Sequence, residues 1–292
     1  MISIAAIIAT WVLSGLTSNS HLLSLALIIA TTMVMVRLNT IHAIMRTYSR
    51  MVSCSFLAIS AIALPYFINP TDAALPLCFS IIYTLLFFSY QDNSSVGIIF
   101  ISFLILGVAS LIYIPVLFLV PILWIIISTR MMSMSARSFF ASILGLITPY
   151  WFAAAYCLYN ANIDMLTSHI TAIANFTPVA DFESLEIRDI AIFAIVMLLF
   201  ITGSIHFIRT SHNDKIRTRM IYESFIIMTL ALIVFAALQP SEIPQLVPIM
   251  SISVSPLIAH YITYTNTRLT NLSFVGIVVI VVLTLAYHIW TL

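Results

Sequence analysis

The stretch IAIFAIVMLLFITGSIHFI, residues 190–208, decides the fold class. It contains no Asp, Glu, Lys or Arg, and a helix of about 20 apolar residues is long enough to cross a hydrocarbon core about 30 Å thick. The rest of the chain has the same character: of its 292 residues, 62% are hydrophobic and only 7% are charged. A soluble domain carries about 25% charged residues. The composition therefore excludes a water-soluble globular fold and predicts an all-α, polytopic membrane helix bundle.

Apolar runs of this kind recur along the chain and predict about 11 transmembrane helices in a single transmembrane domain over 1–292. The stretch 97–129 is ambiguous, because Pro115 and Pro121 interrupt it: it forms either two short spans or one span followed by a re-entrant segment. Polar, Pro or charged residues bound the runs, which lie at roughly 2–14, 21–36, 52–68, 73–90, 97–112, 114–129, 139–159, 190–208, 221–238, 246–263 and 272–290.

The basic residues favour the two-span interpretation of 97–129. With two spans there and the N-terminus inside, ten of the eleven Lys and Arg residues face the cytoplasm, and only Arg188 lies outside. Cytoplasmic loops of membrane proteins carry an excess of Lys and Arg. Merging 97–129 into one span would reverse every later loop and destroy this bias. We therefore expect the N-terminus in the cytoplasm and the C-terminus outside.

Two segments outside the predicted spans are long enough to have their own structure. Residues 38–50, LNTIHAIMRTYSR, place Ile41, Ile44 and Met45 on one helical face and predict an amphipathic helix at the cytoplasmic interface. Residues 160–187 form an extended outer loop, and connections of this length are often functional.

Several classes of partner and cofactor are excluded. The formal net charge is +1, and no basic cluster interleaved with aromatic residues points to nucleic acid. Cys54, Cys78 and Cys157 lie in apolar stretches without CxxC or His spacing, so we expect neither a metal site nor a cofactor. Phosphate-loop, HExxH and GxSxG motifs are absent. The partner that the composition does predict is the lipid bilayer.

The outer loop contains the first candidate site. Asp181 and Glu183 form an Asp-x-Glu pair that could bind a divalent cation holding a diphosphate, as catalytic acids of a transferase would. The alternative is that the carboxylates of this loop favour the N-terminus of the next helix. The first outer loop, residues 14–21, contains no carboxylate.

A second candidate site lies in the cytoplasmic stretch 209–223. Lys215, Arg217 and Arg219 could hold a lipid phosphate at the membrane surface. The alternative is that these charges only set the topology. Glu223 is expected to pair with Arg219, four residues earlier on the same helix.

Interrupted spans provide the third candidate, because Pro in a spanning helix frees backbone carbonyls that can line a substrate cavity. Kinks tolerated by packing are the alternative. The predicted cavity-lining residues are Pro115, Pro149, Ser253, Pro256 and His260. Histidines within spans can also serve as interfacial anchors, which is the alternative role for His260, His206 and His288.

Five segments carry a resemblance to a known family: RLNTIHAIMRTYSRM at 37–51, LGVASLIYIPVLFLVPILW at 106–124, SFFASILGLITPYWF at 138–152, DKIRTRMIYE at 214–223 and SPLIAHYITYTNTR at 255–268. Together they resemble an uncharacterised family of polytopic inner-membrane proteins of Bacteroidota-type bacteria. The run SLIYIP is more distantly similar to polymerases and transferases of lipid-linked glycans. The resemblance implies a bacterial inner membrane and handling of lipid-linked glycan, with a polyprenyl-phosphate lipid as partner. The alternatives are a small-molecule or lipid transporter or flippase, and a scaffold or accessory subunit.

Overall fold

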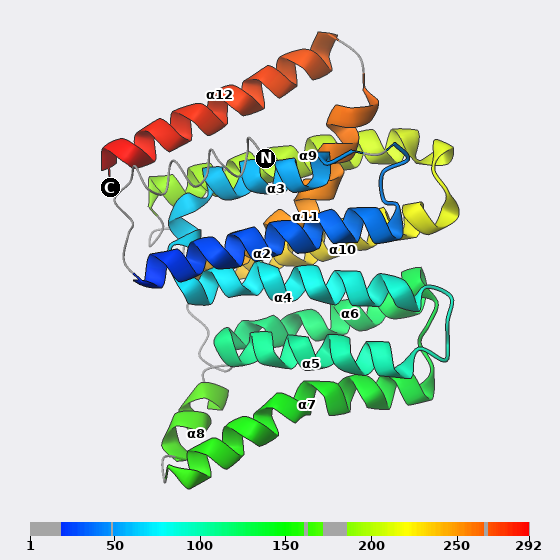
Figure 1. The fold of residues 1–292 in the computed structure, drawn as a ribbon, viewed down its shortest axis with the longest axis vertical. Helices are drawn as coiled ribbons and strands as arrows, with labels where there is room; N and C mark the ends of the chain where they lie inside the picture. Colours follow the sequence, from blue (N-terminus) through cyan, green and yellow to red (C-terminus); the bar gives the residue numbers. More distant parts are fainter. Residues whose placement is uncertain (1–18, 48, 161–162, 172–185, 266–267, 292) are drawn as a thin grey trace.

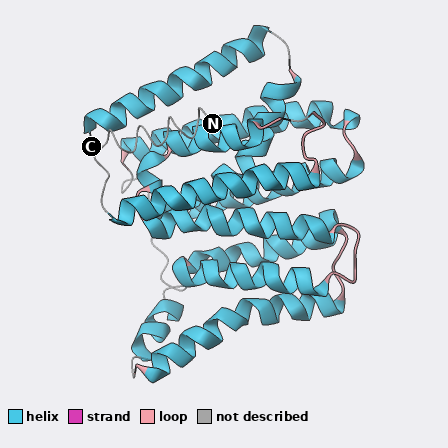
Figure 2. Ribbon diagram, in the orientation of Figure 1, coloured by secondary structure: helices cyan, strands magenta, loops and turns pink. Residues whose placement is uncertain are grey.

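The computed structural model describes residues 19–47, 49–160, 163–171, 186–265 and 268–291, and this part of the chain contains helices and no strand (Figures 1 and 2). Most of the long helices run side by side, from α12 at one edge to α7 and α8 at the other. The principal helices are α2 (Asn19–His42), α3 (Met51–Ile62), α4 (Pro70–Leu86), α5 (Val96–Ile112), α6 (Val120–Ile126), α7 (Ala136–Tyr159), α8 (Ile163–Thr171), α9 (Ile187–Thr210), α10 (Ile216–Leu238), α11 (Ile243–Tyr264) and α12 (Arg268–Thr291).

Seven helical segments of the described chain are long and apolar enough to cross a membrane, which supports the predicted class of a helical membrane protein. Met51–Ile62, Val96–Ile112 and Asn271–Thr284 are shorter apolar helices. Every predicted run from 21–36 onward coincides with a helix, whereas the first run, 2–14, lies outside the described residues. The total of 11 spans stays a prediction.

The ambiguous stretch 97–129 forms two antiparallel helical segments. After α5 the backbone of Tyr113 is extended (φ −140°, ψ 96°), because the nearby Pro115 disfavours a continuous helix. A 3₁₀ segment η3 (Ile114–Leu119), α6 and a π-helical segment η4 (Ile127–Met131) then run back. The amide of Gln91, before α5, donates to the carbonyl of Met131, at the end of η4 (2.8 Å). The start of α5 and the end of η4 therefore lie at the same end of the bundle, and the crossing of the membrane by both segments stays a prediction.

Helix α11 forms the centre of the bundle. Every residue from Leu246 to His260 is buried, and α3, α4, α9 and α10 pack around it. A helix buried on all sides is apolar all round, as this one is apart from small hydroxyl residues and His260. Gly203 of α9 allows the close approach of the two helices, since a Cβ there would lie 2.9 Å from the backbone carbon of Leu257. Small residues at such crossings let membrane helices pack closely.

The structure differs from the predicted amphipathic helix over 38–50. Helix α2 continues to His42 and ends at Ala43, whose φ is +46°, and the described residues between Ala43 and Met51 form no helix. The apolar side chains of Ile44 and Met45 are buried in the bundle, not spread on a membrane surface. Asn39 holds this turn, because its side-chain amide donates to the carbonyl of Ser49 (2.7 Å) and its Oδ1 accepts from the amide of Met45 (3.3 Å). Tertiary contacts outweigh the local helical periodicity here.

The predicted loop 160–187 contains a short helix, α8. Asp164, Thr167 and Ser168 of α8 are exposed, and the ring of His169 contacts the carbonyl of Ser110 at the end of α5 (3.1 Å). This contact places α8 beside the C-terminal end of α5. Residues 172–185 lie outside the described residues.

Candidate functional site

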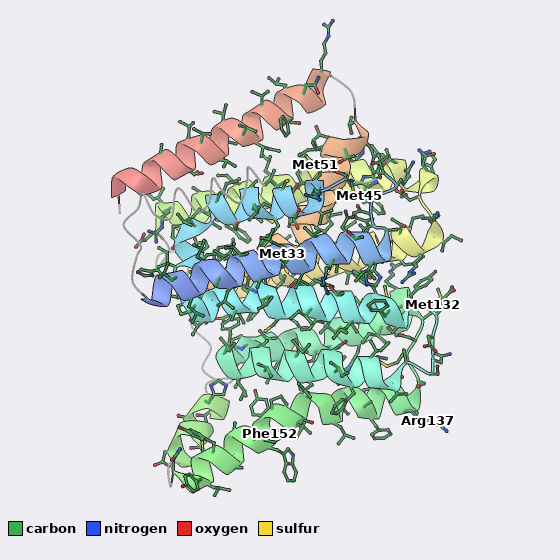
Figure 3. The ribbon with its side chains drawn as sticks, in the orientation of Figure 1. Met33, Met45, Met51, Met132, Arg137 and Phe152 are labelled. Carbon is green, nitrogen blue, oxygen red and sulfur yellow. The ribbon has the colours of Figure 1, made fainter. Side chains whose placement is uncertain are left out.

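Basic side chains gather at one end of the bundle. The connections after α2, α4, η4, α9 and α11 meet there, on the right in Figures 1 and 3. Arg188, at the start of α9, is the one exception among all Lys and Arg residues. We call this the basic end; its connections and adjoining helical turns contain Arg37, Arg46, Arg50, Arg130, Arg137, Arg209, Lys215, Arg217, Arg219 and Arg268.

A buried carboxylate organises the basic end. Asp214 lies in the connection between α9 and α10, and only 1% of its side chain is exposed. Its Oδ1 accepts a hydrogen bond from Nε of Arg46 (2.6 Å), and its Oδ2 lies 3.2 Å from Nε2 of His260, which is fully buried at the end of α11. A buried charge is expensive unless it is both paired and hydrogen-bonded, and Asp214 meets both conditions.

Arg46 is the exposed member of this cluster. Its side chain is 40% exposed, and its Nη atoms have no hydrogen bond within the described residues. The ring of Tyr264 lies against the guanidinium, 5.0 Å from centroid to Cζ, and the Tyr264 hydroxyl accepts from the Arg46 amide. The hydrogen bond to Asp214 raises the pKa of Arg46 above its ordinary value. Arg46 is therefore a permanent cation whose orientation is fixed from the buried side.

Aromatic rings enclose the His260 side of the cluster. The rings of Tyr222 and His206 lie 5.1 and 5.4 Å from the His260 ring, and Phe207 lies 5.5 Å from it. The Nδ1 atom of His260 is buried without a hydrogen-bond partner in the described part of the chain. Because Asp214 accepts at Nε2, the neutral tautomer with a proton on Nε2 suits this site.

Arg217 holds two other elements of the basic end together. Its Nη2 donates to the carbonyl of Phe87 at the end of α4 (3.0 Å) and lies 3.3 Å from Nδ1 of His42. Nε2 of His42 contacts the carbonyl of Thr84 (2.9 Å), so Nε2 carries the proton and Nδ1 accepts from Arg217. The cation thus satisfies a carbonyl at a helix C-terminus, where positive charge is favoured.

The expected pair of Glu223 with Arg219 is wrong. Glu223 forms its ion pair with Arg130, which lies in η4 on the neighbouring wall of the bundle. Nε of Arg219 is buried without a partner among the described residues. The helical spacing of four residues made the local pair possible, but the side chain of Glu223 faces η4.

The three predicted lipid-phosphate residues therefore have different surroundings. Lys215 is exposed at the N-cap of α10, directly after Asp214. Arg217 is engaged with Phe87 and His42, whereas Arg219 has an unpartnered nitrogen. Lys215, which is exposed, is therefore the member of the predicted set that remains available to an anion, because the unpartnered nitrogen of Arg219 is buried.

The five predicted cavity-lining residues do not line three of the apolar grooves in the described chain. Apolar grooves of about 220 and 240 Å³ flank α12, and a third of about 720 Å³ lies between α6 and α10; none contains one of the five residues. Pro115 lies in the first turn of η3, Pro149 packs against Gly107 of α5, and Ser253 hydrogen-bonds the Tyr83 hydroxyl (2.8 Å). Pro256 and His260 are buried within α11.

Two predictions remain: a site in the acidic outer loop, and no metal site. Asp181 and Glu183 lie outside the described residues. Within the part of the chain that is described, no group of three or more His, Cys, Asp and Glu side chains could hold a metal ion.

Sequence reasoning missed the contact of Arg46 with Asp214. Both residues stood within stretches that the sequence had singled out, 38–50 and 209–223. The available signal was an acid in the middle of a basic connection, since an Asp surrounded by Arg and Lys needs a specific partner. Nothing local indicated that the partner is 168 residues away.

No protein-family model, no curated protein and no solved structure matches the chain. The resemblance to inner-membrane proteins of Bacteroidota-type bacteria therefore stays a hypothesis.

Proposed function

We propose that the chain is a multi-pass protein of a bacterial inner membrane that binds the phosphate of an anionic lipid at its basic end. In the orientation that we propose, the basic end faces the cytoplasm, the N-terminus lies inside and the C-terminus lies outside. The lipid class that we propose is polyprenyl phosphate, as part of the handling of lipid-linked glycan.

The fixed and exposed guanidinium of Arg46 carries this proposal. Asp214 occupies Nε, which leaves the two Nη atoms of this 40% exposed side chain without a hydrogen bond in the described residues. An Arg fork matches phosphate oxygens in two-point hydrogen bonding. Because the orientation is set by a buried carboxylate, little side-chain freedom is lost when an anion binds. Lys215 adds a second cation next to Asp214.

The cytoplasmic leaflet favours the same orientation. Its anionic lipids attract basic residues near the surface by about 1 kcal/mol for each Lys or Arg. The segregation of these residues to one end of the structure agrees with the bias of cytoplasmic loops toward Lys and Arg.

Lipid binding is tested with undecaprenyl phosphate in nanodiscs, measured by native mass spectrometry. We expect Arg46→Ala with Lys215→Ala to reduce the bound fraction at least tenfold. Arg188→Ala, at the opposite end, is the matched control and should leave binding unchanged. Equal binding by the double variant and the parent protein would refute the site. A loss for phosphatidylglycerol as well as for undecaprenyl phosphate would support phosphate binding but refute the polyprenyl class.

Orientation is tested by labelling single cysteines from outside intact cells. Cys54, Cys78 and Cys157 are first replaced by Ala. A membrane-impermeant maleimide should then label Arg188→Cys and leave Lys215→Cys unlabelled until the membrane is permeabilised. The reverse pattern would overturn the proposed topology.

A further inference from the structure

An open apolar groove of about 720 Å³ lies between α10 and the segment formed by η3 and α6. On α10, its lining residues follow helical spacing along one face, as Ile227, Leu230, Ala231, Val234 and Leu238 do. Phe118, Leu119 and Ile122 supply the facing wall. Gln239 is the polar residue at its end.

The groove is as long as one leaflet is thick. The eleven residue steps from Ile227 to Leu238 correspond to about 16 Å of helix. Half of a hydrocarbon core about 30 Å thick is about 15 Å. Because α10 begins at the basic end, the groove occupies the half of the bundle farther from that end. A single acyl chain of a lipid in the corresponding leaflet fits this length.

A carboxylate stands at the polar end of the groove. The Tyr113 hydroxyl donates to Oε2 of Glu242 (2.8 Å). Tyr113 directly precedes η3, and Glu242 ends the short 3₁₀ turn η7 (Pro240–Glu242), where its amide donates to the carbonyl of Gln239 (3.2 Å). The hydrogen bond between Tyr113 and Glu242 therefore connects the two walls of the groove at its end and holds the carboxylate there.

Within the described residues, no Lys or Arg side chain forms an ion pair with Glu242. Arg188, the one such residue away from the basic end, contacts Glu186 (3.2 Å) and Asp189 (3.4 Å) instead. A lipid with an ammonium headgroup complements a fixed carboxylate, whereas a lipid with net negative charge is repelled by it.

We propose that this groove binds a phosphatidylethanolamine-type lipid, with one acyl chain between α6 and α10 and the ammonium group at Glu242. Contacts between the groove and the acyl chain retain the lipid, and the carboxylate of Glu242 selects its headgroup. This site lies at the opposite end from the proposed phosphate site and does not depend on it.

The test uses nanodiscs that contain equal amounts of phosphatidylethanolamine and phosphatidylglycerol with identical acyl chains. Native mass spectrometry after release from the nanodisc counts the lipids retained by the protein. We expect the parent protein to retain phosphatidylethanolamine at least fivefold over phosphatidylglycerol. Glu242→Gln keeps an acceptor for Tyr113 but removes the charge, so it should abolish the preference. Ala231→Trp fills the groove and should release the lipid of either kind.

Two variants control for general effects on the membrane surface. Glu186→Gln removes another carboxylate from the same end, and Leu144→Trp adds an indole to the lipid-facing side of α7, where Leu144 is 62% exposed. Both should retain lipid as the parent does. Equal retention of the two lipids, or a preference that survives Glu242→Gln, would overturn the headgroup assignment. Retention unaffected by Ala231→Trp would place the lipid elsewhere. No retained lipid at all would overturn the proposal.

Discussion

Replacing Asp214 by Ala should destabilise the protein by an amount that can be worked out from its two partners. His260 is fully buried, so its Nε2–H loses its acceptor where water cannot replace it, which costs about 1–3 kcal/mol. Arg46 is 40% exposed, so water solvates the released guanidinium and its share is about 0.5–1 kcal/mol. The free energy of unfolding should therefore fall by about 1.5–4 kcal/mol.

The assay is equilibrium unfolding in mixed micelles of dodecyl maltoside and SDS, followed by circular dichroism. Asp92→Ala is the control, because Asp92 is an aspartate at the same end whose side chain hydrogen-bonds, within the described residues, only to the nearby Ser94. Its effect should stay within about 0.5 kcal/mol. In a double-mutant cycle, Arg46→Ala should add little once Asp214 is absent. An Asp214→Ala variant as stable as the Asp92→Ala variant would refute the reasoning, since it would mean that the buried cluster contributes nothing to the fold.

Three further substitutions test helix packing and hydrogen bonds to backbone carbonyls. Gly203→Ala should lower the free energy of unfolding by about 1–3 kcal/mol through overpacking, whereas Gly276→Ala in α12, where a Cβ meets nothing within 4 Å, should be neutral or stabilising in the same titration. Arg217→Ala should speed hydrogen exchange of the backbone after α4, and unchanged exchange there would contradict its assigned role. Ser255→Ala should cost more stability than Ser251→Ala, and the reverse order in SDS titration would be evidence against the assignment of Ser255 argued below.

The helices were predictable because the physics that determines them is local. The long uncharged runs indicated membrane helices, and Pro115 indicated a break that the structure places beside Tyr113. The distribution of Lys and Arg also predicted that alternate connections share one end. The contacts of Arg46 with Asp214 and of Arg217 with Phe87 agree with this for the connections after α2, α4 and α9. Charges collect in connections because their burial in hydrocarbon is costly, and this rule needs no knowledge of packing.

The site was not predictable because its contacts join distant segments. Sequence spacing offered Arg219 as the partner of Glu223, but the partner is Arg130 of another segment. Similarly, the periodicity of 38–50 placed Ile44 and Met45 on an apolar face, and the structure buries both in the bundle without forming the helix. Helical periodicity states which residues share a face, but not what that face contacts.

The interrupted helix α11 shows why a proline in a span need not indicate a cavity. Pro256 has no amide hydrogen, so the carbonyl of Ile252, four residues earlier, loses its helical donor. The hydroxyl of Ser255 donates to that carbonyl (3.3 Å), and hydroxyl side chains are known to satisfy backbone groups in this way within membrane helices. The hydroxyl of Ser251 instead contacts the carbonyl of Pro248 (2.6 Å). That carbonyl keeps its helical donor, because Ile252, four residues later, has an amide hydrogen. A Ser directly before a Pro can therefore hydrogen-bond the carbonyl that the Pro leaves without a donor, which favours a buried helix over one that lines a water-filled path. The complete burial of Leu246 to His260 agrees with this.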